Sequence, residues 1–435
     1  MTSRTAFLFP GQGAYVPGIL GEWAEHFPTA ARTLQTVDEI AAEHGLEPVT
    51  PLLLERGSPS LDELLSQRSD VVDLAIYATD AVAFELLSEL GVRADVLVGH
   101  SFGEFAALSA AGAVSVVDVA RLACLRIEAP RRVDPPEGGL VALSVSAGRA
   151  GHLVALLDEP HLCVAIDNGP DQSVLSGPAS CLADVEKLAA SLDIRATRLR
   201  ARYAFHNPLM YEAADLFTRT ASDVPLHEPR IPVFSPTLGR FVRSVTDVRE
   251  VIHRNLVTPV HFYDALLTLF REGTRVFVET GARSALTKIV RASLPSAVSA
   301  VPLLPSRGRP LELLKELDAA GVPFAWPRDD DPATAPTTPA RETVRPDPRT
   351  AAGPPDRSVL MAELVGMYAE ELGFPEEMLT PDIDLEADLG VDSVKQIALF
   401  ERVRRQYGLP ELPSQRRIQA TTLEELAGLV EELRP

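Results

Sequence analysis

Ser101 is the residue whose setting most directly indicates chemistry. It stands at the centre of Gly99-His100-Ser101-Phe102-Gly103, which matches the G-x-S-x-G pattern of a nucleophile elbow. The apolar run 95–100 predicts a strand before it, and the small and apolar residues of 102–114 predict a helix after it. Such a turn exposes the hydroxyl at a helix N-terminus, where developing negative charge is favoured. We expect Ser101 to be a nucleophile; a plain glycine-rich turn is the alternative.

A serine nucleophile needs a base within hydrogen-bond reach, and the chain offers nine histidines. His206 stands out in the segment 203–210, YAFHNPLM, because it follows a basic predicted strand and precedes a proline by two positions. His100 is a rival, but alternation along a strand directs its side chain to the face opposite Ser101. We expect His206 to be the base, although a core-edge histidine satisfied by backbone would look the same locally.

The segment Gly11-Gln12-Gly13 follows another apolar run, 6–10, which also predicts a strand. Its backbone N–H groups would lie at the carboxyl edge of a parallel sheet, where open α/β sheets bind ligands. Together with the N–H of Phe102, Gln12 is expected to form an oxyanion hole. A simple turn is the alternative.

Three regions of different composition carry these residues. Residues 1–326 mix strand and helix patterns, and a further strand at 274–281 favours a mainly parallel sheet covered by helices on both faces. Within them, about 138–202 is strand-rich and predicts an inserted α+β subdomain. Residues 327–357 are rich in proline and poor in large apolar residues, which predicts an extended linker of roughly 30 Å end to end. Residues 358–435 predict an acidic bundle of three helices at about 358–372, 392–406 and 421–433.

The composition excludes several classes of protein. A net charge of −20 over 435 residues disfavours nucleic acid and anionic membranes as partners. The most apolar stretch, 71–90, carries three acidic residues and suits a buried helix better than a membrane span. The N-terminus shows no signal peptide. Three scattered cysteines, Cys124, Cys163 and Cys181, predict reduced thiols in a cytoplasmic protein, with neither a disulfide framework nor a metal site.

The first region resembles the malonyl-CoA:acyl-carrier-protein acyltransferases of fatty acid and polyketide synthases. The resemblance covers about residues 1–326 and rests on FPGQG, GHSFGE, an arginine 25 residues after the serine, and YAFHNPLM, in that order. It implies an α/β fold, in which an α/β-hydrolase-like core with a parallel sheet holds an inserted ferredoxin-like subdomain. It also implies a Ser101–His206 dyad that works by ping-pong kinetics.

The same resemblance assigns roles to further residues. Arg126 resembles the arginine that pairs with the free carboxylate of a malonyl group, as a bidentate fork would. Asn168 resembles a polar residue near the acyl site. Asn255 falls where the family orients the histidine through a backbone carbonyl. Taken alone, Arg126 would be read as a solvated helix arginine and Asn168 as a turn former.

Departures from the family pattern bear on the acyl group. Tyr15 replaces a usual glutamine and Pro130 a usual methionine. The segment Tyr203-Ala204-Phe205-His206 mixes the HAFH typical of malonyl transferases with the YASH typical of methylmalonyl ones. Because Phe205 beside the base would crowd an α-substituent, with Tyr203 as a second substrate-binding residue, we expect plain malonyl; a substituted malonyl unit is the alternative.

The last region resembles acyl carrier proteins. Residues 388–395, DLGVDSVK, are similar to the phosphopantetheine site, which makes Ser393 the expected attachment point for a covalent 4'-phosphopantetheine. The implied partners are malonyl-CoA or a related dicarboxylic acyl-CoA, a phosphopantetheinyl transferase, and a ketosynthase with other synthase subunits. Loading could occur on this carrier or on a separate one.

Two other functions use parts of the same residue set. An editing thioesterase would share the serine, base and oxyanion hole but has no use for Arg126 as a carboxylate partner. A module with an inert first domain would only present the carrier, and the intact Ser101, His206 and Arg126 argue against it. The product, the partner synthase and the oligomeric state are not specified by the sequence.

Overall fold

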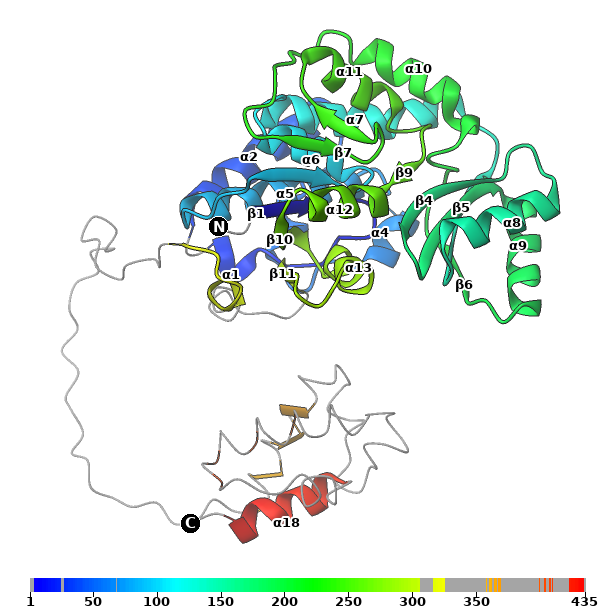
Figure 1. Ribbon diagram of the computed structural model, residues 1–435. Coiled ribbons are helices and arrows are strands. Elements are labelled where there is room, and N and C mark those ends of the chain that lie inside the picture. Colours follow the sequence, from blue (N-terminus) through cyan, green and yellow to red (C-terminus); the bar gives the residue numbers. More distant parts are fainter. Residues whose placement is uncertain are drawn as a thin grey trace. The chain divides into compact units, whose positions relative to one another are not determined.

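The computed structural model describes residues 4–24, 27–67, 69–305, 316–324 and 422–433, and single positions between 357 and 409. The chain divides into two compact units, residues 1–331 and 332–435 (Figure 1). The predicted linker 327–357 lies outside the described residues except for its last position.

The core of the first unit is a six-stranded sheet. In sheet order its strands are β11 (Ser299–Leu304), β10 (Thr274–Ala282), β1 (Arg4–Phe9), β2 (Val96–Gly99), β7 (Val233–Ser235) and β8 (Arg240–Val242). The first five strands are mutually parallel, and only β8 runs antiparallel, as a hairpin with β7. The mainly parallel sheet predicted from the three apolar runs is confirmed, since β1, β2 and β10 are those runs.

Helices pack on either side of this sheet (Figure 1). They are α1 (Gly21–Ala24), α2 (Pro28–Glu43), α3 (Thr50–Leu54), α4 (Leu61–Gln67), α5 (Val72–Glu89), α6 (Gly103–Ala110), α7 (Val116–Val133), α10 (Tyr211–Thr220), α11 (Val245–Arg254), α12 (Phe262–Arg271) and α13 (Ala285–Ser293), with a 3₁₀ turn at Pro208–Met210. The stretch predicted as a buried helix is α5, which packs against β10 and is apolar nearly all round because its neighbours enclose it. In the described part of the chain, no helix combines the length and apolarity that a membrane span requires.

A second sheet lies beside the first in the same unit. Its strands, in sheet order, are β6 (Ala196–Leu199), β3 (Gly138–Leu143), β5 (Gln172–Pro178), β4 (Cys163–Gly169) and β9 (Val260–His261). Helices α8 (Ala147–Leu157) and α9 (Ala179–Ser191) cover it, so the chain order through this subdomain is β-α-β-β-α-β, the order of ferredoxin-like domains. The sheet also extends beyond the predicted 138–202 insertion, because β9 pairs in parallel with β4.

The second unit has its own small core. The last predicted helix corresponds to α18 (Leu423–Leu433), whose apolar side contributes Leu423, Leu426, Ala427 and Val430 to it. The described residues from 360 to 409 add leucines and other apolar side chains to the same core. Ser393 lies outside the described residues.

Candidate active site

The turn between β2 and α6 presents Ser101 in a strained conformation. Ser101 has φ of 57°, in the left-handed region that L-residues other than asparagine and aspartate rarely enter. Both flanking glycines are required by close backbone approach. A Cβ on Gly99 would lie 2.1 Å from the backbone nitrogen of Glu104, and one on Gly103 would lie 2.1 Å from the carbonyl oxygen of Phe9. The G-x-S-x-G spacing therefore seats the turn on the end of β1.

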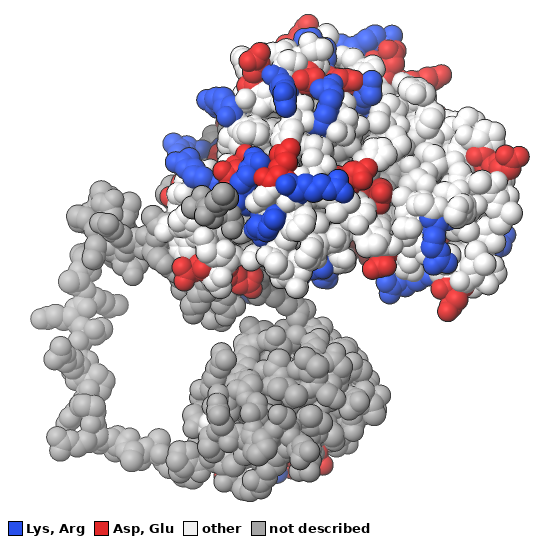
Figure 2. Space-filling model, viewed as in Figure 1, with Lys and Arg blue, Asp and Glu red and all other residues white. Residues whose placement is uncertain are grey.

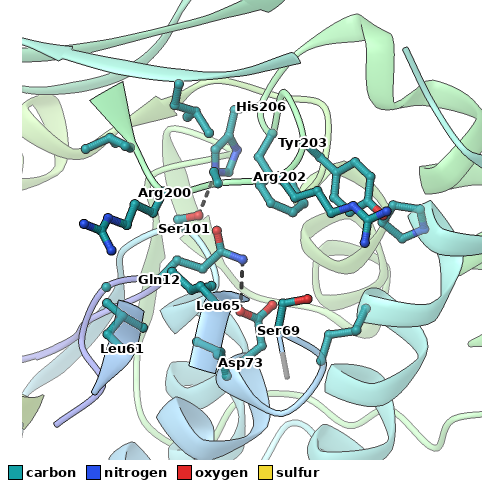
Figure 3. Close-up of a pocket in the computed structure, with 18 of the residues that line it drawn as sticks. Gln12, Leu61, Leu65, Ser69, Asp73, Ser101, Arg200, Arg202, Tyr203 and His206 are labelled. Atoms are coloured by element: carbon teal, nitrogen blue, oxygen red, sulfur yellow. Dashed lines mark hydrogen bonds between the residues drawn. The ribbon is translucent and has the colours of Figure 1, made fainter. Parts of the chain in front are cut away.

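His206 completes a hydrogen-bonded pair with the serine. Ser101 Oγ lies 2.6 Å from His206 Nε2 (Figure 3). His206 Nδ1 lies 2.9 Å from the carbonyl oxygen of Thr258. A carbonyl can only accept, so Nδ1 carries the proton, and Nε2 is left to accept from the serine hydroxyl. This corrects the role expected for Asn255, because the orienting carbonyl belongs to Thr258, three residues further along the chain.

Burial keeps the imidazole neutral. His206 is 1% exposed, and this burial, reinforced by the positive charge of Arg126 and by His100, lowers its pKa to about 3, against the opposing hydrogen bond to Thr258. A neutral imidazole is the form that can take a proton from Ser101.

Asn255 instead holds the nucleophile turn through hydrogen bonds of its side chain. Its side chain is fully buried, its Nδ2 donates to the carbonyl of Ser101 at 2.9 Å, and its Oδ1 accepts from Arg126 Nε at 3.1 Å. It thus ties the strained serine to the buried guanidinium, a positioning role that the family resemblance did not indicate.

Arg126 is buried and already paired. It is 1% exposed, and its Nη1 donates to Asp73 Oδ2 at 2.6 Å. The rings of Phe102 and Phe205 lie 5.2 and 4.9 Å from the centre of its guanidinium group. The reading of Arg126 as a solvated helix arginine is therefore wrong, and its pairing with Asp73 was not foreseen.

Gln12 and Phe102 are brought to the same place. A Cβ on Gly11 would lie 3.3 Å from the backbone nitrogen of Phe102 and 3.5 Å from Ser101 Cβ, so the turn after β1 lies directly against the nucleophile turn. The side chain of Gln12 is fixed separately, because its Nε2 donates to Asp73 Oδ1 at 2.9 Å (Figure 3).

Asn168 does not line the cavity that contains Ser101 but contacts a residue that does. Its Oδ1 lies 2.8 Å from His100 Nε2, and its Nδ2 donates to Gln172 at 2.9 Å. His100 itself lines the cavity, which differs from the expectation that it faces away from Ser101. Asn168 was predicted to contact the acyl site, but its position on β4 brings its side chain against the His100 ring instead.

A cavity of about 380 Å³ opens from Ser101. Apolar side chains from α4, α5 and the small sheet line it, namely Leu61, Leu65, Val72, Leu140 and Ile166, together with the predicted Tyr203 and Phe205. Arginines also line it, including Arg200 and Arg202, which Figure 3 shows beside the dyad. On the outer face of this unit drawn in Figure 2, by contrast, basic and acidic side chains are interleaved.

Two residues at this site were missed by the sequence reasoning. Asp73 stands at the start of an apolar helix, and a carboxylate in the first turn of such a run was a usable sign of a buried partner. Thr258 contributes only its carbonyl, which leaves no sign in the sequence.

Comparison with known families gives two matches. The family model described as acyl transferase domain matches residues 6–317, and the model described as phosphopantetheine attachment site matches residues 362–430.

Individual relatives agree with these matches. The chain is 33% identical over 290 residues to the polyketide synthase GfsA of Streptomyces halstedii, covering 66% of this chain and 4% of that protein. It is 31% identical over 337 residues to the spectinabilin polyketide synthase system protein NorB of Streptomyces orinoci, covering 74% of this chain and 15% of that protein. The chain therefore spans a small part of the length of these relatives.

Solved structures show the same fold over the first unit. The acyltransferase domain from module 8 of the salinomycin polyketide synthase superposes with a TM-score of 0.67 at 30% identity, covering 74% of this chain and 77% of that one. A malonyl-CoA:acyl carrier protein transacylase from Xanthomonas oryzae gives a TM-score of 0.65 at 27% identity, covering 73% and 99%.

Proposed function

Because the chain belongs to the acyl transferase domain family and also carries a phosphopantetheine attachment domain, we propose that it moves an acyl group from coenzyme A, through Ser101, to a phosphopantetheine thiol. The observation that carries this proposal is the distance of 2.6 Å between Ser101 Oγ and the neutral Nε2 of His206 at the floor of a largely apolar cavity.

The reaction proceeds in two displacements. His206 Nε2 takes the hydroxyl proton as Ser101 Oγ attacks the thioester carbonyl, and the C–S bond breaks to leave an ester on Ser101. The same proton passes from His206 to the departing coenzyme A sulfur. The incoming phosphopantetheine thiol then gives its proton to His206 Nε2 and attacks the ester carbonyl. The C–O bond breaks, and His206 returns that proton to Ser101 Oγ.

The protein contributes three things to these steps. The carbonyl of Thr258 fixes the tautomer and direction of the imidazole. The backbone N–H groups of Gln12 and Phe102 are proposed to hold the oxyanion, since their turns adjoin at Ser101. The apolar side chains that line the cavity are proposed to limit the access of water to the acyl-serine ester, which is what separates a transferase from a hydrolase.

The acceptor is proposed to be the thiol of a phosphopantetheine arm on Ser393, or on a separate carrier. The carrier-type motif around Ser393 and the family match over 362–430 support this assignment. A phosphopantetheinyl transferase must install the arm. A ketosynthase and other synthase subunits would use the product, as in the polyketide synthases to which the chain is similar.

Malonyl is the acyl group that the family resemblance predicts, and the name of the Xanthomonas oryzae relative supports it. The prediction depends on Arg126 as the partner of the substrate carboxylate. In this structure that guanidinium is bonded to Asp73, so a malonyl carboxylate would have to share or displace Asp73.

Intact-protein mass spectrometry tests the reaction. The phosphopantetheinylated chain is offered malonyl-, methylmalonyl- and acetyl-CoA, with Ser101→Ala as the control. Acyl mass on both Ser101 and the Ser393 arm is expected, and none in the control. Release of free acid without label on either site would replace the transferase with a thioesterase, and a chain inert to every acyl-CoA would leave only carrier presentation.

A further inference from the structure

Asp73 is bonded to Arg126, the residue that a substrate carboxylate would need as its partner. It lies in the first turn of α5, is buried, and lines the cavity that contains Ser101. Its Oδ2 accepts from Arg126 Nη1 at 2.6 Å, and its Oδ1 accepts from Gln12 Nε2 at 2.9 Å (Figure 3). Both carboxylate oxygens are therefore bonded before any substrate enters.

Arg126 is bonded to the protein through two of its three guanidinium nitrogens. Its Nη1 and Nε are bonded to Asp73 and Asn255, and the rings of Phe102 and Phe205 lie within 5.2 Å of its guanidinium carbon. Arg126 and Asp73 form a closed ion pair at 2.6 Å, with side chains that are 1% and 6% exposed.

This pair changes which acyl groups the cavity favours. A substrate carboxylate would add a second buried negative charge to a pair that is already neutral, or would expel Asp73 and leave it without its cation. An uncharged acyl group disturbs neither partner and contacts the apolar side chains that line the same cavity, such as Leu61, Leu65 and Val72.

The other arginines of the cavity do not replace Arg126 in this role. Arg131, Arg198 and Arg200 have side chains that are 36–62% exposed, and they pair with Asp70, Glu186 and Asp62. Arg202 and Arg283 are also exposed, and they contact the ring of Tyr203 and the carbonyl oxygen of Tyr15. A carboxylate held by such hydrated groups gains little selectivity.

We propose that Asp73 acts as a built-in substitute for a substrate carboxylate, so that the site selects acyl groups without a free carboxylate. The proposal deepens the acyl transfer proposed above and rests on it. Asp73 is then a specificity-determining residue whose charge discriminates against malonyl-type groups and leaves short uncharged acyl groups unaffected.

Competition between thioesters tests this selection on the full chain. Equimolar malonyl-CoA and acetyl-CoA are mixed with the wild type, Asp73→Asn and Asp73→Glu, and the acyl masses on Ser101 are compared at early times. Asp73→Asn removes the competing charge and retains an acceptor for Arg126. It is expected to raise the malonyl-to-acetyl ratio by about tenfold or more, through a lower KM for malonyl-CoA. Asp73→Glu retains the charge and is expected to keep the wild-type ratio.

Two results would overturn the proposal. One is an unchanged ratio in Asp73→Asn while both thioesters still acylate Ser101; the other is a wild type that already prefers malonyl-CoA by about tenfold or more. Failure of every thioester to acylate Ser101 in the wild type would instead overturn the acyl transfer itself.

The folded wild type covers the case in which Asp73→Asn does not fold. In the same competition, acetyl-CoA is expected to acylate Ser101 of the wild type about tenfold or more faster than malonyl-CoA. A folded wild type, judged by circular dichroism, that is acylated by malonyl-CoA as fast as by acetyl-CoA would contradict the proposal.

Discussion

Lowering the pH should leave the acylation of Ser101 almost unchanged over a range in which an ordinary histidine base would fail. The structure places the pKa of His206 near 3, because the ring is buried and faces the positive charge of Arg126 and the ring of His100. At pH 5, an imidazole with a pKa of 6.5 would be neutral in about 3% of molecules, whereas one with a pKa of 3 is neutral in about 99%. The two cases differ about thirtyfold in the concentration of active base.

Single-turnover acylation measured from pH 4.5 to 8 separates these cases. Acyl mass on Ser101 is followed at millisecond to second times with acetyl-CoA, whose uncharged acyl group avoids a second titration in the substrate. We expect less than a twofold change between pH 5 and pH 8, provided that circular dichroism shows a folded chain. A rate that falls about tenfold per pH unit below pH 6.5 would refute the buried, neutral base.

The lowered pKa of His206 also makes the free energy of unfolding depend on pH, and the two pKa values fix the direction of this dependence. The pKa of His206 is depressed in the folded chain relative to 6.5, so the unfolded chain binds the extra proton as the pH falls. The stabilisation is complete above pH 6.5 and is lost toward pH 3. Between pH 7 and pH 5 the loss is about 2 kcal/mol of unfolding free energy. A His206→Asn variant should lack this part of the acid destabilisation, and an unchanged pH slope would contradict the shift.

Three further variants test the framework around the dyad. Ser393→Ala should leave Ser101 acylation intact and abolish stable acyl label on the C-terminal region; label that persists there, located by peptide mass spectrometry, would place the arm elsewhere. Gly103→Ala should lower the free energy of unfolding in urea by about 3 kcal/mol or more, because the added Cβ would lie 2.1 Å from a carbonyl oxygen of β1. The matched helix variant Gly151→Ala, whose Cβ meets no atom within 4 Å, should raise that free energy by up to about 1 kcal/mol. Equal effects of the two substitutions would argue against the close approach at Gly103. Asn255→Ala removes three buried hydrogen bonds, to Ser101, Arg126 and Glu104, and should cost about 3 kcal/mol in the same assay. A loss below about 1 kcal/mol would show that these bonds contribute little.

Local patterns carried enough information to predict much of this site. The turn around Ser101 needs glycines at fixed positions because a Cβ there would clash with neighbouring backbone atoms. A steric requirement of this kind can be recognised from the sequence motif alone. The strands beside it, 4–9 and 96–99, are buried on both faces and therefore read as continuous apolar runs. The motif order then brought His206 to the serine from 105 residues away along the chain.

The misses share a physical cause, which is that tertiary contacts chose between chemically similar partners. The histidine could be oriented by any nearby carbonyl, and the position of β9 selected that of Thr258. Arg126 could face a ligand or a protein carboxylate, and only the approach of α5 decided for Asp73. Asn168 was placed correctly on its strand, but the side chain meets His100 because of how the second sheet is set against the first.

The pairing of β9 with β4 connects the dyad to the arrangement of the two sheets. Ser101 follows a strand of the large sheet, while the carbonyl that aims His206 lies two residues before the strand that joins the small sheet. A slide of one sheet past the other would therefore swing the imidazole away from the hydroxyl even if no cavity side chain changed. The distance between Ser101 Oγ and His206 Nε2 therefore depends on how the two sheets pack against each other. Substitutions where the two sheets meet can lower activity even though they lie far from Ser101.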